Sequence, residues 1–181
     1  MFETFKYPKS SKVGFPFEHL ELYSKARRID GKKINLEEKL KEIKNQPTLL
    51  FITRYPIYTL TFLKQWIRPF QEQYPDAQLL MLGIQEFNSY LSISPVLRWS
   101  VRRALSDREK ESFYVLYDER KNILTRILFE KLNLSNKFGA YFFLLDSKGK
   151  ISLRGVGSGG EKDIQLLNQA YQEEIQINKE N

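Results

Sequence analysis

Long uninterrupted runs of apolar residues predict the buried strands of this chain. Three such runs occur, at Thr48–Arg54, Ala77–Ile84 and Ala140–Leu145. A strand in the middle of a parallel sheet is covered on both faces, so it is apolar at successive positions rather than at alternate ones. Pro47 and Pro56 bound the first run. We therefore predict that Thr48–Arg54 is a buried central strand and that the other two runs are further strands.

Shorter segments extend this prediction. In Phe17–Tyr23, Leu20 and Leu22 alternate with polar residues, as in a half-buried strand. Asp30-Gly31-Lys32 has the residue types of a turn, and Asp146–Gly149, with glycine at its last position, predicts the turn of a β-hairpin. The remaining predicted strands are Lys33–Leu36, Phe113–Tyr117 and Lys150–Arg154.

Between these strands, apolar residues recur at helical spacing. Pro95 is expected to begin a helix, because proline is favoured in a first turn. Pro69 is expected to kink or break another helix near its end, because proline has no backbone N–H to donate. The predicted helices are Glu37–Lys44, Tyr58–Tyr74, Pro95–Leu105, Lys121–Lys131 and Glu161–Ile175.

The order of these elements predicts the fold class. Strands and helices alternate, and a hairpin and a final helix close the chain, which indicates an α/β fold of thioredoxin-like type. We expect a mainly parallel central sheet with a C-terminal β-hairpin and helices on both faces. Residues 1–15 are predicted to be an extended N-terminal segment, residues 16–175 the domain, and residues 176–181 a polar tail that frays.

Composition narrows the function. The 181 residues suit one domain, and 29 basic against 22 acidic residues give a formal charge of +7. A basic surface favours an anionic partner, such as nucleic acid, anionic lipid or an acidic protein. We expect no membrane-spanning helix, because no apolar run approaches the required length of about 20 residues. Met1–Lys12 lacks the apolar stretch of a secretory signal and, with Glu3 and no arginine, makes a poor mitochondrial presequence.

The chain has no cysteine and a single histidine, His19. Without cysteine it has no disulfides, thiolate chemistry or cysteine-based zinc site. One imidazole is a poor basis for a metal site, and a catalytic triad would have to use His19. We therefore expect no catalytic residues, no metal and no cofactor, and we predict that the protein is not an enzyme.

One motif is typical of a cofactor-binding site. Gly155–Gly160 fits the G-x-G-x-x-G pattern of dinucleotide-binding loops and lies between a predicted strand and a predicted helix. Only 21 residues follow it, which is too few for the next strand and its ribose-binding acid. A tight connection between strand and helix is the better interpretation, and an anion bound at the helix N-terminus is the alternative.

Two stretches resemble known families. The first, Phe17–Ile57, resembles the opening of peroxiredoxin-type thioredoxin folds, in which a strand leads to a loop that holds reactive cysteines at a helix N-terminus. Here the loop is Arg54-Tyr55-Pro56-Ile57 and contains no sulfur. The resemblance therefore implies the fold without the thiol chemistry.

The second resemblance is more specific. Trp66, Pro69 and Phe70, then the strand Gln78–Glu86, then Asn136–Gly159 with Gly139 and Tyr141, are similar in order to the mitochondrial ATP synthase assembly factors of the ATP-ten type. That family often has a tryptophan in the strand after the hairpin, where this chain has Ser152-Leu153-Arg154. The resemblance implies a chaperone for the newly made proton-channel subunit of the ATP synthase.

A surface for such a partner can be predicted. Arginines accompany Trp99 on the helix that begins at Pro95, and this pattern fits either a solvated basic face or a docking surface for a membrane or a nascent subunit. Trp66 and Phe70 fit either the core or a contact. Nucleic-acid binding is disfavoured because the charge is spread out and no recognition motif accompanies it. The candidate interaction residues are Trp66, Pro69, Phe70, Arg98, Trp99, Arg102, Arg103, Gly139 and Tyr141.

These observations lead to one expected function and one alternative. We expect a non-enzymatic assembly factor on the matrix side of the mitochondrial inner membrane that binds a membrane-embedded ATP synthase subunit and has peripheral contact with the membrane. The alternative is a permanent structural subunit of a large mitochondrial complex, such as the ATP synthase, a respiratory complex or the mitochondrial ribosome.

Overall fold

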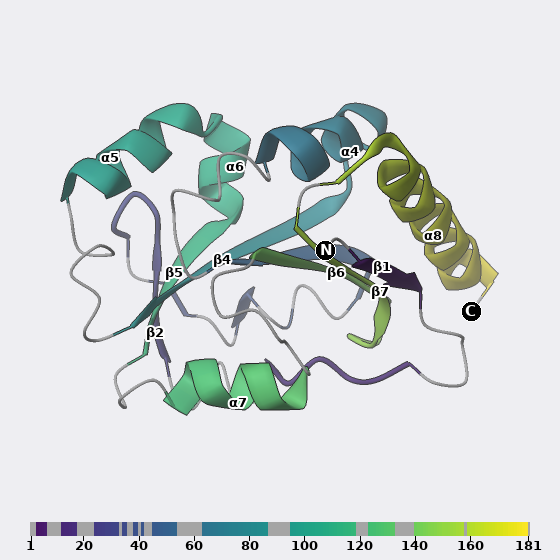
Figure 1. Ribbon diagram of the computed structural model, residues 1–181, viewed down its shortest axis with the longest axis horizontal. Coiled ribbons are helices and arrows are strands. Elements are labelled where there is room, and N and C mark those ends of the chain that lie inside the picture. The colour runs from purple at the N-terminus through teal and green to yellow at the C-terminus, as the bar shows by residue number, and fades with distance from the viewer. Residues whose placement is uncertain are drawn as a thin grey trace.

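The computed structural model describes residues 3–6, 12–17, 24–32, 34–35, 38–39, 41, 45–53, 63–86, 95–118, 123–132, 140–157 and 159–180. Its centre is a seven-stranded sheet of order β1-β7-β6-β3-β4-β5-β2. Figure 1 shows helices on both faces of this sheet. The strands are β1 (Glu3–Lys6), β2 (Ser24–Arg28), β3 (Thr48–Thr53), β4 (Gln78–Glu86), β5 (Phe113–Asp118), β6 (Ala140–Leu145) and β7 (Ile151–Val156).

The predicted central strand is confirmed. All residues of β3 are buried, and β3 pairs in parallel with β4 and antiparallel with β6. Leu50 faces Leu80 on one side and Phe143 on the other. The sheet is therefore mixed: β3, β4 and β5 are mutually parallel, and the β6–β7 hairpin adds antiparallel strands. This arrangement is the predicted α/β thioredoxin-like fold with its C-terminal hairpin, but the sheet is not mainly parallel as expected. The β3–β4 and β4–β5 pairs are parallel, and the other four strand pairs are antiparallel.

The two edge strands were not predicted. β1 pairs antiparallel with β7, so the N-terminal segment contributes to the sheet, and β2 pairs antiparallel with β5. An edge strand has one neighbour and tolerates charged residues, so the basic β2 lacks the apolar pattern of a strand. The strand predicted at Phe17–Tyr23 lies outside the described residues except for Phe17, which is not in a strand. Ile34 and Asn35, from the strand predicted at Lys33–Leu36, are not in a strand either.

The helices form two layers. In Figure 1 the helices α4, α5, α6 and α8 cover one face of the sheet, and α7 covers the other. Each layer buries its own hydrophobic core: one core includes Trp66 and Phe70, and the other includes Leu128 and Leu132. The bounds are η2, a π-helical turn (Leu63–Ile67), α4 (Arg68–Gln73), α5 (Pro95–Ala104), α6 (Asp107–Ser112), α7 (Ile123–Lys131) and α8 (Glu161–Glu180).

Three details of the helices differ from the predictions. Pro69 lies in the first turn of α4, directly after the π-helical turn η2, so the helix changes type at this proline instead of breaking near its C-terminal end. A first turn is where the missing N–H of proline costs least. The short helix α6 was missed, although Ser106 and Glu109 form a capping box at its start. α8 continues to Glu180 beyond the predicted end at Ile175, so the tail that was expected to fray is helical as far as Glu180.

The C-terminal hairpin is confirmed and holds the N-terminal segment in place. Its turn closes with a Gly149 N–H donated to the Asp146 carbonyl at 2.9 Å, and Gly149 takes a positive φ of 74°. The register between β6 and β7 skips Ser152, whose hydroxyl donates to Glu174 of α8 at 2.8 Å. Lys12 forms an ion pair with the same carboxylate at 2.6 Å. Residues 12–17 are therefore part of the domain rather than a free lead-in.

Candidate interaction surface

The structure divides the predicted interaction residues into core and surface. Trp66, Phe70 and Tyr141 are 1%, 1% and 2% exposed, so they are core residues and their assignment to a surface was wrong. Helix packing explains the error for Trp66 and Phe70, since the aromatic stripe of η2 and α4 lies against the sheet. Tyr141 is buried because it lies in the strand β6. The Trp66 ring packs 4.1 Å from the Phe142 ring of β6, and the Phe70 ring packs 4.9 Å from Tyr171 of α8.

Three other candidates cannot be assigned to an exposed surface. Pro69 is half-buried at the start of α4. Gly139 lies outside the described residues. Arg98 belongs to α5, but its side chain lies outside what the structure describes.

The glycine-rich segment that begins at the end of β7 serves the packing of aromatic side chains. The Trp66 indole N–H donates to the Gly157 carbonyl at 2.8 Å. A Cβ on Gly159 would lie 2.4 Å from Cε2 of Trp66, and a Cβ on Gly155 would lie 1.9 Å from Cε1 of Phe142. Close approach of neighbouring side chains therefore explains these glycines, which are not needed to approach a pyrophosphate.

The N-terminus of α8 carries its own negative charge. The Gly160 N–H donates to the Asp163 carboxylate at 3.0 Å, and Glu161 lies in the same turn. Carboxylates at this end stabilise the positive end of the helix dipole and repel a second anion. The geometry therefore favours the tight-connection interpretation over an anion site.

The remaining candidates gather on α5. Trp99 is 58% exposed, while Val101 and Leu105 on the opposite side of the helix are buried in the core. Arg102 and Arg103 are exposed, and the guanidinium carbon of Arg103 lies 5.2 Å from the centre of the Trp99 ring. This distance is that of a cation–π contact. We call Trp99, Arg102 and Arg103 the α5 surface.

Local sequence explains why α5 forms. Pro95 occupies its first position, and Val101 and Leu105 are spaced by one helical turn so that both reach the core. Arg102 and Arg103 lie in the last turn, where positive charge complements the helix dipole. Within the described part of the chain neither arginine forms an ion pair, whereas Arg28 pairs with Asp30.

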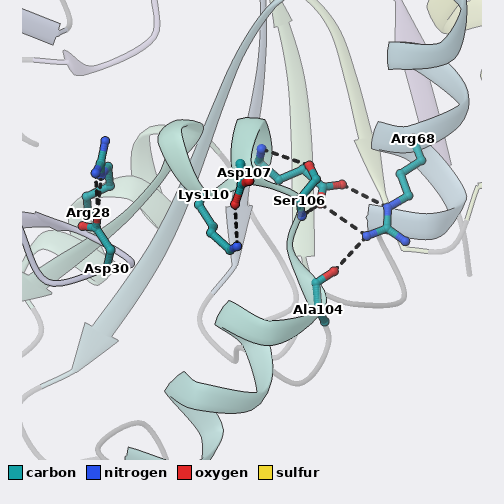
Figure 2. A network of polar contacts seen from close by, with 8 residues as sticks. Arg28, Asp30, Arg68, Ala104, Ser106, Asp107 and Lys110 are labelled. Carbon is teal, nitrogen blue, oxygen red and sulfur yellow. Dashed lines mark hydrogen bonds and ion pairs between the residues drawn. The ribbon is translucent and has the colours of Figure 1, made fainter.

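A polar network fixes the C-terminal end of α5. Figure 2 shows Arg68 of α4 reaching across to Ala104 and to the capping box that begins α6. Its guanidinium donates to the Ala104 carbonyl at 2.9 Å and to the Glu109 carboxylate at 3.0 Å. Glu109 also accepts the Ser106 N–H at 2.6 Å, and the Ser106 hydroxyl accepts the Glu109 N–H at 3.3 Å. Arg68 therefore joins α4, which directly follows the turn containing Trp66, to the helix that carries Trp99.

Charge balance keeps this network ionised. The carboxylate of Glu109 is buried, and burial alone would raise its pKa. The hydrogen bonds from Arg68 and Ser106 outweigh burial, so the pKa of Glu109 lies below its ordinary value. The same hydrogen bond raises the pKa of Arg68. On the other side of α6, Lys110 pairs with Asp107 at 2.8 Å (Figure 2).

Among the described residues, no group of three or more His, Asp or Glu side chains is placed to hold a metal ion. None of the helices described is both long and apolar enough to cross a bilayer.

The comparison with protein families decides the affiliation. A family model described as ATP10 protein matches residues 51–173 of the 181. The chain belongs to the ATP10 family. Membership of the ATP10 family implies a role in ATP synthase assembly. The matched region contains both tryptophans, the α5 surface and the glycine-rich segment, so the features described above belong to the family domain. No curated protein sequence matches the chain.

Solved structures agree on the fold. BsSco, a member of the Sco family of cytochrome c oxidase assembly proteins, has a TM-score of 0.52 at 10% identity and covers 86% of this chain and 96% of its own. A DsbF homologue from Corynebacterium diphtheriae has a TM-score of 0.53 at 10% identity and covers 94% and 92%. A putative thiol-disulfide oxidoreductase from Bacteroides vulgatus has a TM-score of 0.50 at 13% identity and covers 94% and 91%. At such identities the likeness of this ATP10 family member to these proteins is a likeness of fold alone.

Proposed function

We propose that this protein is a non-enzymatic assembly factor for the membrane sector of the mitochondrial ATP synthase. It acts on the matrix side of the inner membrane and binds the newly made proton-channel subunit until that subunit is incorporated. Membership of the ATP10 family, over residues 51–173, is the observation that carries the proposal.

The residue inventory supports binding rather than catalysis. Thioredoxin-like enzymes that exchange disulfides need a thiolate, and these 181 residues contain no cysteine. His19 is the single histidine, so general acid–base chemistry by an imidazole would depend on that residue alone. Binding to a protein partner needs a folded surface and requires neither a thiolate nor an imidazole.

The test is affinity purification of the tagged protein from gently solubilised mitochondria after labelling of newly made organelle-encoded proteins. We expect the labelled proton-channel subunit to co-purify in an amount well below that of the tagged protein, and to leave it during a chase. The variant His19→Ala tests for an enzymatic role, because it removes the single histidine. We expect it to support ATP synthase assembly as well as the unchanged chain does.

Three results would contradict the proposal. Co-purification of the mature ATP synthase in equal amount would indicate a permanent structural subunit. Co-purification of a respiratory complex or of ribosomal proteins would assign the protein to a different complex. Loss of assembly in His19→Ala, with the protein folded and abundant, would indicate catalysis.

A further inference from the structure

We propose that the α5 surface docks the protein reversibly on an anionic bilayer. In this arrangement Arg102 and Arg103 bind lipid phosphates, and the Trp99 ring lies at the level of the headgroups. The inference goes beyond the proposed function and does not depend on a protein client.

The exposure of Trp99 is the first observation behind this proposal. Among the described residues, the exposed large hydrophobic side chains are Val13 and Trp99, while Trp66 is buried. A tryptophan that is 58% exposed leaves much apolar ring in water. Tryptophan has an apolar body and one N–H donor, which suits the boundary between headgroups and acyl chains.

Uncompensated charge is the second observation. α5 carries Arg98, Arg102 and Arg103 and no acidic residue. Two basic side chains nearby are neutralised, since Arg68 pairs with Glu109 and Lys110 pairs with Asp107. Arg102 and Arg103, in contrast, form no ion pair within the described residues. The surface therefore carries net positive charge and complements an anionic one.

The geometry of the arginines suits phosphate. The guanidinium carbon of Arg103 lies over the Trp99 ring, and a cation–π contact of this kind does not require the N–H groups to hydrogen-bond to the ring. The N–H groups remain able to bind phosphate oxygens in pairs. Arg68 holds the Ala104 carbonyl at the end of α5, so the helix is already positioned before any ligand binds.

The shape of the surface favours a bilayer over other anionic partners. α5 lies on the outside of its helix layer (Figure 1), and Trp99 projects on the side away from the core. An outward helix face fits a broad, deformable surface more readily than a narrow groove. A nucleic acid would be bound mainly by a larger number of cations, and an exposed tryptophan beside so few arginines fits lipid better.

Vesicle binding tests the proposal directly. The purified full chain is mixed at low salt with phosphatidylcholine vesicles that contain or lack phosphatidylglycerol, and bound protein is measured by sedimentation. We expect binding to the anionic vesicles only, and weaker binding at high salt. The double variant Arg102→Gln/Arg103→Gln should bind roughly 20- to 30-fold more weakly, since each basic residue near an anionic surface contributes about fivefold.

α7 provides a matched control. Arg126 and Lys131 are exposed there, on the opposite face of the sheet (Figure 1). The variant Arg126→Gln/Lys131→Gln removes the same charge from the molecule, so it should keep most of the affinity. Equal loss in both double variants would show that net charge acts without a defined site, and would overturn the proposal.

The depth of Trp99 gives a second, independent readout. Brominated lipid quenches tryptophan fluorescence at the membrane interface, and the buried Trp66 serves as an internal reference. We expect quenching in the unchanged chain and none in Trp99→Ala. Absence of quenching in the unchanged chain would overturn the proposal even if the protein sedimented with vesicles.

Client binding separates this proposal from the proposed function. If Arg102→Gln/Arg103→Gln loses vesicle binding but still co-purifies with the labelled subunit, both proposals are supported. If the unchanged chain does not bind anionic vesicles and the variant no longer co-purifies with the labelled subunit, the α5 surface binds protein. The assignment to lipid is then wrong. If vesicle binding behaves as expected but no labelled subunit is recovered, the proposed function fails alone.

Discussion

The two tryptophans of this chain occupy opposite environments. Trp66 is 1% exposed, packs on Phe142, and donates its indole N–H to Gly157. Trp99 is 58% exposed and contacts the guanidinium of Arg103. Both lie in helical segments of the same layer, and both are followed within three residues by arginine.

The difference shows that the sheet decides which aromatic residue belongs to the core. Trp66 lies on a helical turn that packs directly on β6, where Phe142 and the glycines of the segment after β7 shape its position. Trp99 lies on the side of α5 away from Val101 and Leu105, which occupy the core. Trp66 is therefore part of the folded scaffold, and Trp99 is available to a partner.

Truncation of each tryptophan should give the largest contrast. Trp66→Ala removes a buried ring and its hydrogen bond, so it should lower the free energy of unfolding by about 3–5 kcal/mol. Trp99→Ala removes an exposed ring and should change that free energy by about 0.5 kcal/mol or less. Urea titration followed by circular dichroism measures both variants. Similar losses in the two would mean that Trp99 also supports the core.

The glycines that accommodate the aromatic rings allow a second test. Gly155→Ala places a Cβ 1.9 Å from Phe142, so the ring must shift, and the free energy of unfolding should fall by about 1–3 kcal/mol. Gly14→Ala is the matched control, because no atom lies within 4 Å of the added Cβ, and it should be nearly neutral.

If the loss in Gly155→Ala comes from a steric clash with Phe142, the effects of substitutions at these two positions should be coupled. Combining Gly155→Ala with Phe142→Leu should cost less than the sum of the single changes, since the smaller side chain leaves room for the methyl group. Strict additivity would show that the loss comes from the strand backbone rather than from the contact with Phe142.

The network between the two tryptophan regions gives a smaller effect that depends on pH. Glu109→Gln weakens the hydrogen bonds with Arg68 and Ser106 and should lower the free energy of unfolding by about 1–2 kcal/mol near neutral pH. The pKa of Glu109 is depressed in the folded state, so its contribution is fully present above the unfolded pKa of about 4.3.

That contribution is lost as pH falls through the folded pKa of Glu109, which lies lower still. The difference in unfolding free energy between the unchanged chain and Glu109→Gln should therefore be constant above about pH 5 and shrink below about pH 4. Urea titrations of both proteins at several pH values measure it. A difference that grows on acidification would contradict the assignment of Glu109 as an ionised partner of Arg68. Asp30, whose pKa is lowered to about 2 by its hydrogen bond with Arg28, is present in both proteins and cancels in the difference.

Local sequence was sufficient for the central elements. The apolar runs predicted β3, β4 and β6, because a strand covered on both faces must be apolar throughout. Proline and glycine predicted the start of α5 and the turn before β7, because their backbone preferences act within a few residues. The order of the short motifs along the chain predicted the ATP10 family, and the family model confirms it.

Tertiary structure decided the rest. β1 and β2 became strands because β7 and β5 offered free edges, and no apolar pattern of their own identified them. The π-helical turn before Pro69 and the helical residues after Ile175 likewise depend on what surrounds them. Helical spacing placed aromatic residues on stripes but could not say which stripe faces the sheet, since packing between distant segments sets that direction. The sequence by itself thus determined the fold class and the central strands, and it contains no cysteine. Only the packed structure assigned Trp66 to the core and Trp99 to the surface.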